Sequence, residues 1–229
     1  MKTKKFAFLF FFLSFAALLS AQTTDSHQGN GDKNYYVLIE TSYGNMTVKL
    51  YNETPLHRDN FLKLVENGYY DSLLFHRVIN NFMIQGGDPE SKHARPGAML
   101  GNGTLGYTVP AEFVPGLYHK KGALAAARQG DEVNPQKASS SCQFYIVQGN
   151  VWDENRLQML EKRFGMSLTP EQREIYSTLG GTPHLDGAYT VFGEVVEGLD
   201  VIDKIATVKT GPMDRPVEDV RMKMSVIKK

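Results

Sequence analysis

The sequence predicts a mainly β domain, in which an antiparallel sheet closes into a barrel that carries flanking helices and an inserted helical hairpin. Three observations lead to this class. Short β-type runs broken by glycine and proline extend over residues 75–147, a pattern typical of a barrel or sandwich. Between residues 147 and 184 the apolar residues instead recur at helical spacing. The strand pattern then returns at residues 189–196, so the helices interrupt a single β domain.

The first segment has the features of a secretory signal peptide. Lysines at positions 2, 4 and 5 precede the apolar run Phe6–Leu19, and the small residues Ser20 and Ala21 close that run. We expect cleavage after Ala21. The alternative is an uncleaved membrane anchor, but 14 apolar residues are too few to span a bilayer comfortably.

These features divide the chain into three parts. We expect a signal peptide over 1–21, a flexible polar leader over 22–34 and one domain over 35–229, with the helical insert at about 152–181. The protein is then exported. A periplasmic location is preferred because no cell-wall attachment signal follows the final strand.

Within the domain, the first elements are a hairpin and a helix. Residues 36–41 and 45–51 are rich in β-formers and flank a short turn. Thr54 and Pro55 then supply a helix N-cap and a first helical residue, and Gly68 is a natural stop.

The later elements are helical before they return to strand. Leu157, Leu160 and Phe164 share one helical face, and Thr169 with Gln172 forms a capping box ahead of a second helix. We expect the apolar face of this hairpin to cover the barrel, although it could dock a partner. A short helix over 199–206 and a closing strand over 221–227 complete the domain.

Charge and cysteine content exclude several classes of function. The chain has 25 basic and 25 acidic residues, and without the three signal lysines 22 basic residues face 25 acidic ones. A net charge of about −3 favours neither nucleic acid nor an anionic membrane. Cys142 is the single cysteine, so no internal disulfide can form. It lies in an apolar run, which indicates a core residue rather than a nucleophile.

The most informative stretch is FHRVINNFMIQGGD, residues 75–88. It places Arg77 near an aromatic and thioether pair, a glutamine and two glycines. Together with QFYI at 143–146 and LDG at 185–187, it resembles the cyclophilin family of peptidyl-prolyl cis/trans isomerases. The resemblance extends from about Tyr36 to Lys228. An arginine keeps its proton at any working pH and is therefore a fixed donor, which suits a reaction that breaks no bond.

Arg77 matches the arginine of the family's Phe-His-Arg motif and is our candidate catalytic residue. Rotation about a peptide bond costs about 18–20 kcal/mol because the nitrogen lone pair is delocalised into the carbonyl. In the twisted transition state the prolyl nitrogen becomes pyramidal and can accept a hydrogen bond. A guanidinium beside it would therefore stabilise the transition state selectively. The alternative is a surface or structural arginine.

The resemblance also implies the substrate-binding residues. The positions that match the proline pocket are apolar, and the two matching glutamines would contact the substrate backbone or hold the arginine. Two further positions match the groove that binds the peptide backbone. These substrate-binding residues are Phe82, Met83, Tyr145 and Leu185 in the pocket, Gln85 and Gln143 as the glutamines, Ala127 and Arg128 in the groove, and His184 and Tyr189 at two further matching positions.

Four of the matching positions depart from the common family pattern. Arg128 replaces an asparagine, so we expect a cation on the rim and a preference for acidic flanking residues. Tyr145 replaces a phenylalanine and its hydroxyl needs a partner. His184 replaces a tryptophan and Tyr189 a histidine. Since that tryptophan holds cyclosporin in other members, we expect weak inhibition by this drug.

Other motifs fail on their context. Residues 101–106 have the spacing of a dinucleotide-binding loop, but the β-type run 107–110 follows them instead of a helix, which indicates a turn beside the groove. The six histidines lack metal-ligand spacing. His76 reads as a packed residue, and Ser139–Ser141 lack a nucleophile elbow.

The sequence therefore predicts an isomerase that needs no cofactor or metal and acts as a monomer. Its partners would be proline-containing peptides and proteins that are folding. The alternative function is a non-catalytic chaperone or adaptor that binds proline-containing peptides. A nucleotide-dependent enzyme is a third possibility, and it would require nucleotide binding at residues 101–106.

Overall fold

The computed structural model describes residues 34–228. The predicted signal peptide, and the leader up to residue 33, lie outside the described residues. The elements in chain order are β1 Tyr35–Thr41, β2 Gly44–Leu50, α1 Pro55–Glu66, β3 Phe75–Ile79, β4 Met83–Gly86, η1 Pro89–Ser91, β5 Thr108–Val109, β6 Ala123–Ala126, β7 Ser139–Ser140, β8 Phe144–Val147, α2 Glu154–Phe164, α3 Pro170–Thr178, η2 Pro183–Leu185, β9 Val191–Glu197, α4 Leu199–Ala206, η3 Pro212–Asp214 and β10 Met222–Ile227.

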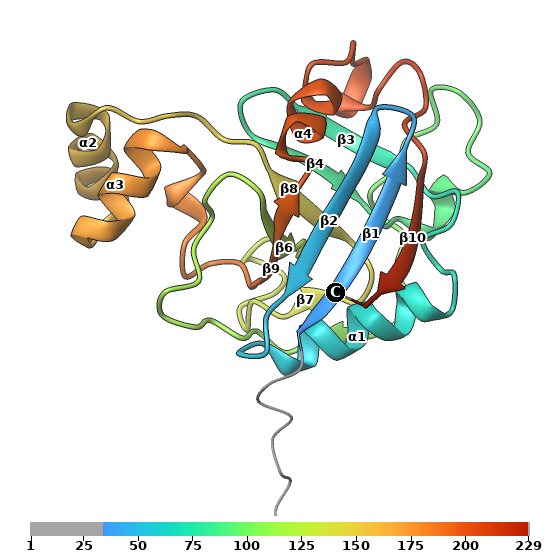
Figure 1. The fold of residues 1–229 in the computed structure, drawn as a ribbon, viewed down its shortest axis with the longest axis horizontal. Helices are drawn as coiled ribbons and strands as arrows, with labels where there is room; N and C mark the ends of the chain where they lie inside the picture. The colour runs from blue at the N-terminus through green and yellow to red at the C-terminus, as the bar shows by residue number, and fades with distance from the viewer. Residues whose placement is uncertain (1–33, 229) are drawn as a thin grey trace, which may run out of the picture. The chain divides into compact units, whose positions relative to one another are not determined.

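Eight strands form one curled antiparallel sheet in the order β10-β1-β2-β9-β6-β8-β4-β3, and β5 pairs with β7 separately. Helix α1 lies at one end of the sheet and α4 at the opposite end (Figure 1). Helices α2 and α3 project to one side, away from β1 and β10 (Figure 1). The mainly β class with flanking helices is therefore present, and two helices occupy the segment where a helical hairpin was expected.

The predicted closure of the sheet into a barrel is not confirmed. Within residues 34–228, β3 and β10 are the two edges of the sheet, and a single bridge, Leu74 with Arg221, joins them. Backbone hydrogen bonds at this corner run from Phe75 N to Val220 O and from Met222 N to Leu73 O. Only the first residue of each strand and the residues just before it pair in this way, so the sheet is a curled half-barrel with a corner contact rather than a continuous ladder.

Helix α1 covers the larger part of the core. It begins at Pro55 and ends at Glu66, just before Gly68, as its sequence predicts. Its side chain Phe61 packs edge-on against Phe144 and Phe192, with ring centroids 5.6 and 5.4 Å apart. Such tilted aromatic contacts stabilise a core beyond the burial of their area.

The predicted N-cap of α1 is wrong in its chemistry. The hydroxyl of Thr54 makes no capping hydrogen bond. The backbone N–H groups of Leu56 and His57 donate instead to the carboxylate of Glu112, at 3.1 and 3.0 Å. A carboxylate at a helix N-terminus satisfies orphan donors and complements the helix dipole. Glu112 comes from a distant loop, so no local pattern could have indicated it.

The helical pair α2 and α3 has a small core of its own. Leu157, Leu168 and Tyr176 are buried together, and the capping box between Thr169 and Gln172 is present. Leu160 is 6 % exposed, but Phe164 at the end of α2 is 51 % exposed. The predicted apolar face of α2 is therefore buried at Leu157 and Leu160 but exposed at Phe164, in the last turn.

Candidate active site

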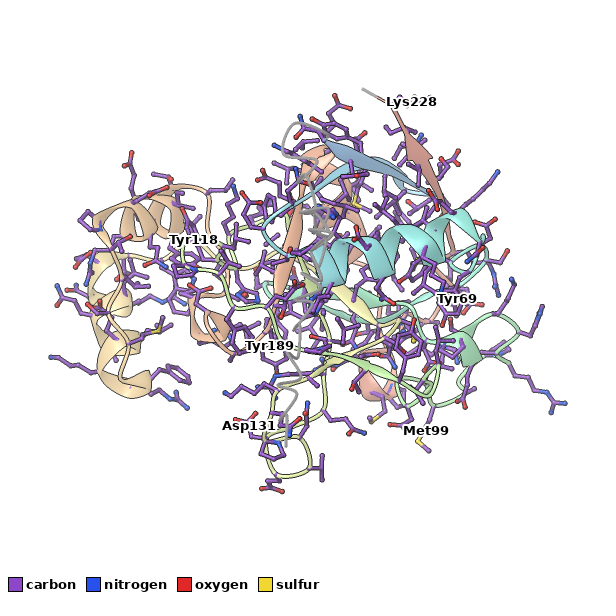
Figure 2. All side chains as sticks on the ribbon, turned by 90° about the horizontal axis from the view of Figure 1, so that it is seen from below. Tyr69, Met99, Tyr118, Asp131, Tyr189 and Lys228 are labelled. Carbon is purple, nitrogen blue, oxygen red and sulfur yellow. The ribbon has the colours of Figure 1, made fainter. Side chains whose placement is uncertain are left out.

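A cavity of about 330 Å³ opens on one face of the sheet. Nine of the eleven side chains predicted to act on the substrate line it. They are Arg77, Phe82, Met83, Gln85, Ala127, Arg128, Tyr145, Leu185 and Tyr189. Of the two remaining residues, Gln143 lines a neighbouring groove and His184 stacks on Phe82. Figure 2 shows Tyr189 between Tyr118, on the side of the helical pair, and Met99 on the far side.

Strand register explains why these residues meet. Arg77 on β3 lies opposite Gln85 on β4, Gln85 opposite Tyr145 on β8, and Tyr145 opposite Ala125 on β6. Residues directly opposite each other project from the same face, and Met83 shares that face with Gln85 because side chains alternate along a strand. Arg77, Gln85 and Tyr145, in one transverse row across three strands, thus line the cavity together.

Arg77 stands at an irregular point of the sheet and is accessible. The register between β3 and β4 shifts between Phe75 and Arg77, an irregularity of the kind that re-aims side chains. The Arg77 side chain is 41 % exposed. Its Nη1 donates to Gln85 Oε1 at 3.4 Å, and its Nε lies 3.5 Å from Asp214 Oδ2. Two neighbours therefore hold the guanidinium while it faces the cavity.

The two predicted glutamines continue this network. Gln85 Nε2 donates to Gln143 Oε1 at 3.1 Å. Gln143 Nε2 donates in turn to the carbonyl oxygens of Gly101 and Gly103, at 2.9 and 2.8 Å. The two glutamines and this loop also line a neighbouring groove of about 670 Å³. Gln143 consequently acts on the loop beside the cavity rather than on the cavity itself.

The segment with dinucleotide-like glycine spacing is this loop. The buried carboxylate of Asp88 accepts hydrogen bonds from the backbone N–H groups of Gly101 and Gly103. A Cβ added to Gly103 would come within 2.1 Å of Asp88 Oδ1, so only glycine fits at this approach. Gly101 and Asn102 line both the cavity and the groove. The expectation of a turn beside the groove is therefore confirmed.

The hydroxyl of Tyr145 has the partner that its position requires. Tyr145 OH lies 2.9 Å from His119 Nε2, and His119 Nδ1 lies 2.9 Å from Asp186 Oδ1. Because a carboxylate only accepts, Nδ1 carries the imidazole proton and Nε2 accepts from the tyrosine. Asp186 Oδ2 also accepts from Tyr176 OH on α3 at 2.6 Å. A buried chain of hydrogen bonds thus connects the wall of the cavity to the helical pair.

Burial raises the pKa of Tyr145 well above its usual range, with the nearby Tyr189 and Asp186 acting in the same direction. The phenol therefore keeps its proton throughout the physiological pH range. It serves as a donor to His119 and as an apolar wall for the cavity, not as an acid or base.

Arg128 does not present a free cation on the rim, which corrects the expectation from sequence. Its side chain is 4 % exposed and its Nη1 lies 2.6 Å from Asp131 Oδ1. Its Nε donates to the carbonyl of Ala188 at 2.7 Å, and its guanidinium covers the ring of Tyr189 at 4.4 Å from the centroid. Because the guanidinium is buried and paired with Asp131, which also pairs with Lys137 at 3.3 Å, the expected preference of Arg128 for acidic flanking residues loses its basis.

His184 does not line the cavity but supports a residue that does. It stacks on Phe82, which lines the cavity, with ring centroids 5.9 Å apart. Leu185 and Tyr189, close to it in sequence, reach the cavity directly. The ring of Tyr189 packs edge-on against Tyr145 at 5.9 Å. The segment after the helical pair therefore supplies one wall.

Sequence reasoning missed several residues of the lining. His76 was interpreted only as packed, although it also lines the cavity, and the others come from the loop 99–102 and from Met213. Met213 and Asp214 both adopt positive φ, of 60° and 57°. Such backbone strain in non-glycine residues is common where side chains are held at functional sites. The unusual backbone is visible only in the structure, so no sequence signal could have found this segment.

Within residues 34–228, no three His, Cys, Asp or Glu side chains are grouped so that they could hold a metal ion. In the same part of the chain, no helix has the length and apolar character needed to cross a membrane. Cys142 is buried, 2 % exposed, and belongs to the main core cluster. The cavity thus combines apolar side chains, among them Met83 and Leu185, with the accessible guanidinium of Arg77 and the side-chain amides of Gln85 and Asn102. This arrangement can hold an apolar ring beside a hydrogen-bond donor.

Known proteins are similar to this chain in sequence. The family model described as cyclophilin type peptidyl-prolyl cis-trans isomerase/CLD matches residues 36–226. A protein of Staphylococcus aureus (strain USA300), provisionally named a peptidyl-prolyl cis-trans isomerase, is 38 % identical over 186 residues, which are 80 % of this chain and 87 % of the relative. A protein of Staphylococcus saprophyticus with the same name matches to the same extent.

Solved structures share the fold. A crystal structure of a cyclophilin type peptidyl-prolyl cis-trans isomerase of Cryptosporidium parvum aligns with a TM-score of 0.61 and 24 % identity, over 86 % of this chain and 99 % of that chain. The same protein in the presence of the dipeptide Ala-Pro aligns with a TM-score of 0.60 and 22 % identity, over 85 % and 99 %. At these identities the likeness concerns the fold alone.

Proposed function

The chain belongs to the family of cyclophilin-type peptidyl-prolyl cis-trans isomerases, and we propose that it accelerates rotation about X–Pro peptide bonds in polypeptides. The observation that carries this proposal is the accessible guanidinium of Arg77 at the rim of an apolar cavity. The proline ring occupies that cavity, against Met83, Leu185 and Tyr145. No cofactor takes part.

Arg77 acts on the prolyl nitrogen. Its Nη1 and Nε face Gln85 and Asp214. Within residues 34–228 no hydrogen bond engages Nη2, so this atom remains to donate to the nitrogen as it becomes pyramidal. The planar amide nitrogen of the ground state offers no free lone pair. The hydrogen bond therefore exists only in the transition state, which is the condition for a faster reaction.

We further propose that the clients are exported proteins that fold outside the cytoplasm. Uncatalysed X–Pro isomerisation takes tens to hundreds of seconds and can limit folding. The lysines and apolar run at the start of the sequence support export. Cell fractionation with mass spectrometry tests this step. The expected product is a periplasmic chain that begins at Gln22, and a cytoplasmic full-length chain would contradict it.

The test of the activity is NMR exchange spectroscopy on an Ala–Pro peptide at catalytic protein concentration. The wild-type chain should produce cis/trans exchange cross-peaks. Arg77→Ala should lower the rate about 10²–10³-fold, the usual effect of removing a donor to a developing lone pair or charge. Arg95→Ala is the matched control, because Arg95 is exposed and does not line the cavity.

Other outcomes would change the assignment. If the wild-type chain shifts peptide signals without interconverting the isomers, it is a binding chaperone or adaptor. If Arg77→Ala retains the wild-type rate, the chain is an isomerase in which another group stabilises the transition state.

A further inference from the structure

Three aromatic rings from separate segments lie next to one another beside the cavity. Phe82 lines the cavity, and His184 in η2 stacks on it with ring centroids 5.9 Å apart and an interplanar angle of 23°. Phe164, the last residue of α2, lies 6.0 Å beyond His184 at 31°. We call Phe82, His184 and Phe164 the aromatic row. The aromatic row joins the cavity, at Phe82, to helix α2 of the helical pair, at Phe164.

The outer end of the aromatic row is not needed for the core of the helical pair. Leu157 and Leu160, which precede Phe164 on the same face of α2, are 0 % and 6 % exposed, whereas Phe164 is 51 % exposed. The guanidinium of Arg163 lies 5.5 Å from the centroid of its ring. Phe164 is thus a large aromatic side chain held in place by its neighbours while much of its surface faces solvent.

The middle of the aromatic row is uncharged at neutral pH. Burial, and to a lesser extent the neighbouring His119, lower the pKa of His184, while Asp186 acts in the opposite direction. A neutral imidazole between two phenyl rings makes the aromatic row a continuous, uncharged strip of rings. His184 lies between Phe82 and Phe164, so it contacts Phe82 but does not itself line the cavity.

We propose that the aromatic row is a second contact site for the substrate polypeptide, which binds an aromatic or large aliphatic side chain two to four residues away from the proline. The two ring-to-ring steps of 5.9 and 6.0 Å cover at most about 12 Å, and an extended chain advances about 3.3 Å per residue, so no more than about four residues span the distance. None of the three rings of the aromatic row lines the groove that Gln85 and Gln143 line, so the bound residue contacts a different surface from that groove.

This inference rests on the proposed function, because the position of the proline in the cavity sets the distance to Phe164. Continuity with the cavity favours the substrate over a separate partner protein. Chains that are still folding expose the apolar side chains that such a strip would recognise. The aromatic row would therefore direct the enzyme toward prolines in apolar segments.

The experiment compares three peptides that contain Ala–Pro: one with alanine on both sides, one with phenylalanine three residues after the proline, and one with phenylalanine three residues before it. Affinity is measured by NMR titration and the isomerisation rate by exchange spectroscopy. We expect one of the phenylalanine peptides, and not the other, to bind about three- to tenfold more tightly than the alanine peptide, the range typical of an aromatic contact.

In Phe164→Ala this affinity ratio should fall to about one. Met159→Ala is the matched control, because Met159 lies on the same helix, is 68 % exposed and does not belong to the aromatic row. It should keep the wild-type ratio and the wild-type rate on the alanine peptide. In the wild-type chain, nuclear Overhauser contacts between the peptide phenyl ring and the Phe164 ring provide a readout that needs no variant.

Several results would overturn the inference: an affinity ratio near one in the wild type, equal gains for both phenylalanine peptides, or a ratio that survives Phe164→Ala. Self-association that depends on concentration and is lost in Phe164→Ala would assign the aromatic row to a second copy of the chain. The preference is measured as binding, so its outcome is separate from turnover. If the chain binds one phenylalanine peptide more tightly but produces no exchange cross-peaks, the proposed isomerase activity is contradicted and the contact site is still supported.

Discussion

Replacing Tyr145 with phenylalanine should destabilise the folded protein by about 1–3 kcal/mol. His119 is fully buried, and Tyr145 OH is the donor to its Nε2, at 2.9 Å. The change removes that donor and leaves a buried acceptor without a partner, which costs the desolvation of the group rather than the smaller net value of one hydrogen bond. Its Nδ1 cannot compensate because it is held by Asp186 at 2.9 Å.

The assay is urea denaturation followed by circular dichroism, with an unchanged slope as evidence that only stability has changed. A loss of this size corresponds to a fall of about 2–12 °C in Tm for a domain of this length. Tyr189→Phe is the matched control, because within residues 34–228 the hydroxyl of Tyr189 makes no hydrogen bond. It should stay within about 0.5 kcal/mol of the wild type. Equal midpoints for Tyr145→Phe and the wild type would refute the role of Tyr145 as the donor to His119.

Three further predictions concern Arg77, His76 and His184. Asp214→Asn removes the charge 3.5 Å from the Arg77 guanidinium, and because the pair is solvent-exposed we expect kcat/KM on an Ala–Pro peptide to fall only about two- to fivefold; an unchanged kcat/KM would show that Asp214 does not position the arginine. Burial lowers the pKa of His76 to about 4, against the opposing effect of Asp88. Between about pH 6.5 and 4, His76 is therefore protonated in the unfolded chain but not in the folded chain. The contribution of the neutral His76 to the free energy of unfolding is complete above this window and falls by roughly 3 kcal/mol as pH decreases through it. Urea midpoints at stepped pH should show a shallower fall in His76→Gln, and an equal slope would count against this assignment. We also expect weak inhibition by cyclosporin, with tighter inhibition of His184→Trp because an indole N–H is restored at that position; equal inhibition of both proteins would contradict the prediction.

Local elements were predictable because their causes are local. The helix over 199–206 has the predicted bounds, and the final strand begins at Met222, one residue after the expected start. The capping box of α3 forms between residues three apart in sequence. Propensity, periodicity and caps act within a few residues, so the sequence reveals them without knowledge of the fold.

Long-range contacts were not predictable in the same way. Glu112 replaces Thr54 as the cap of α1, and Asp131 pairs with Arg128. The chain also brings Asp214 to Arg77. Each of these contacts depends on how the loops are placed in the folded domain, and the sequence position of a carboxylate does not indicate which group it will contact.

The sequence by itself indicated the mainly β class, because strand and helix patterns are local, and it indicated the family, because residues 75–88, 143–146 and 185–187 resemble that family. That resemblance in turn implied most residues of the cavity. The tertiary structure alone decided that the sheet stays open at β3 and β10, that Tyr145 connects to the helical pair, and that Phe164 remains exposed beside His184. The physical reason is that closure, buried hydrogen-bond chains and exposed aromatic surface arise from contacts between segments far apart in sequence. Their geometry is set by packing of the whole domain and not by any local pattern.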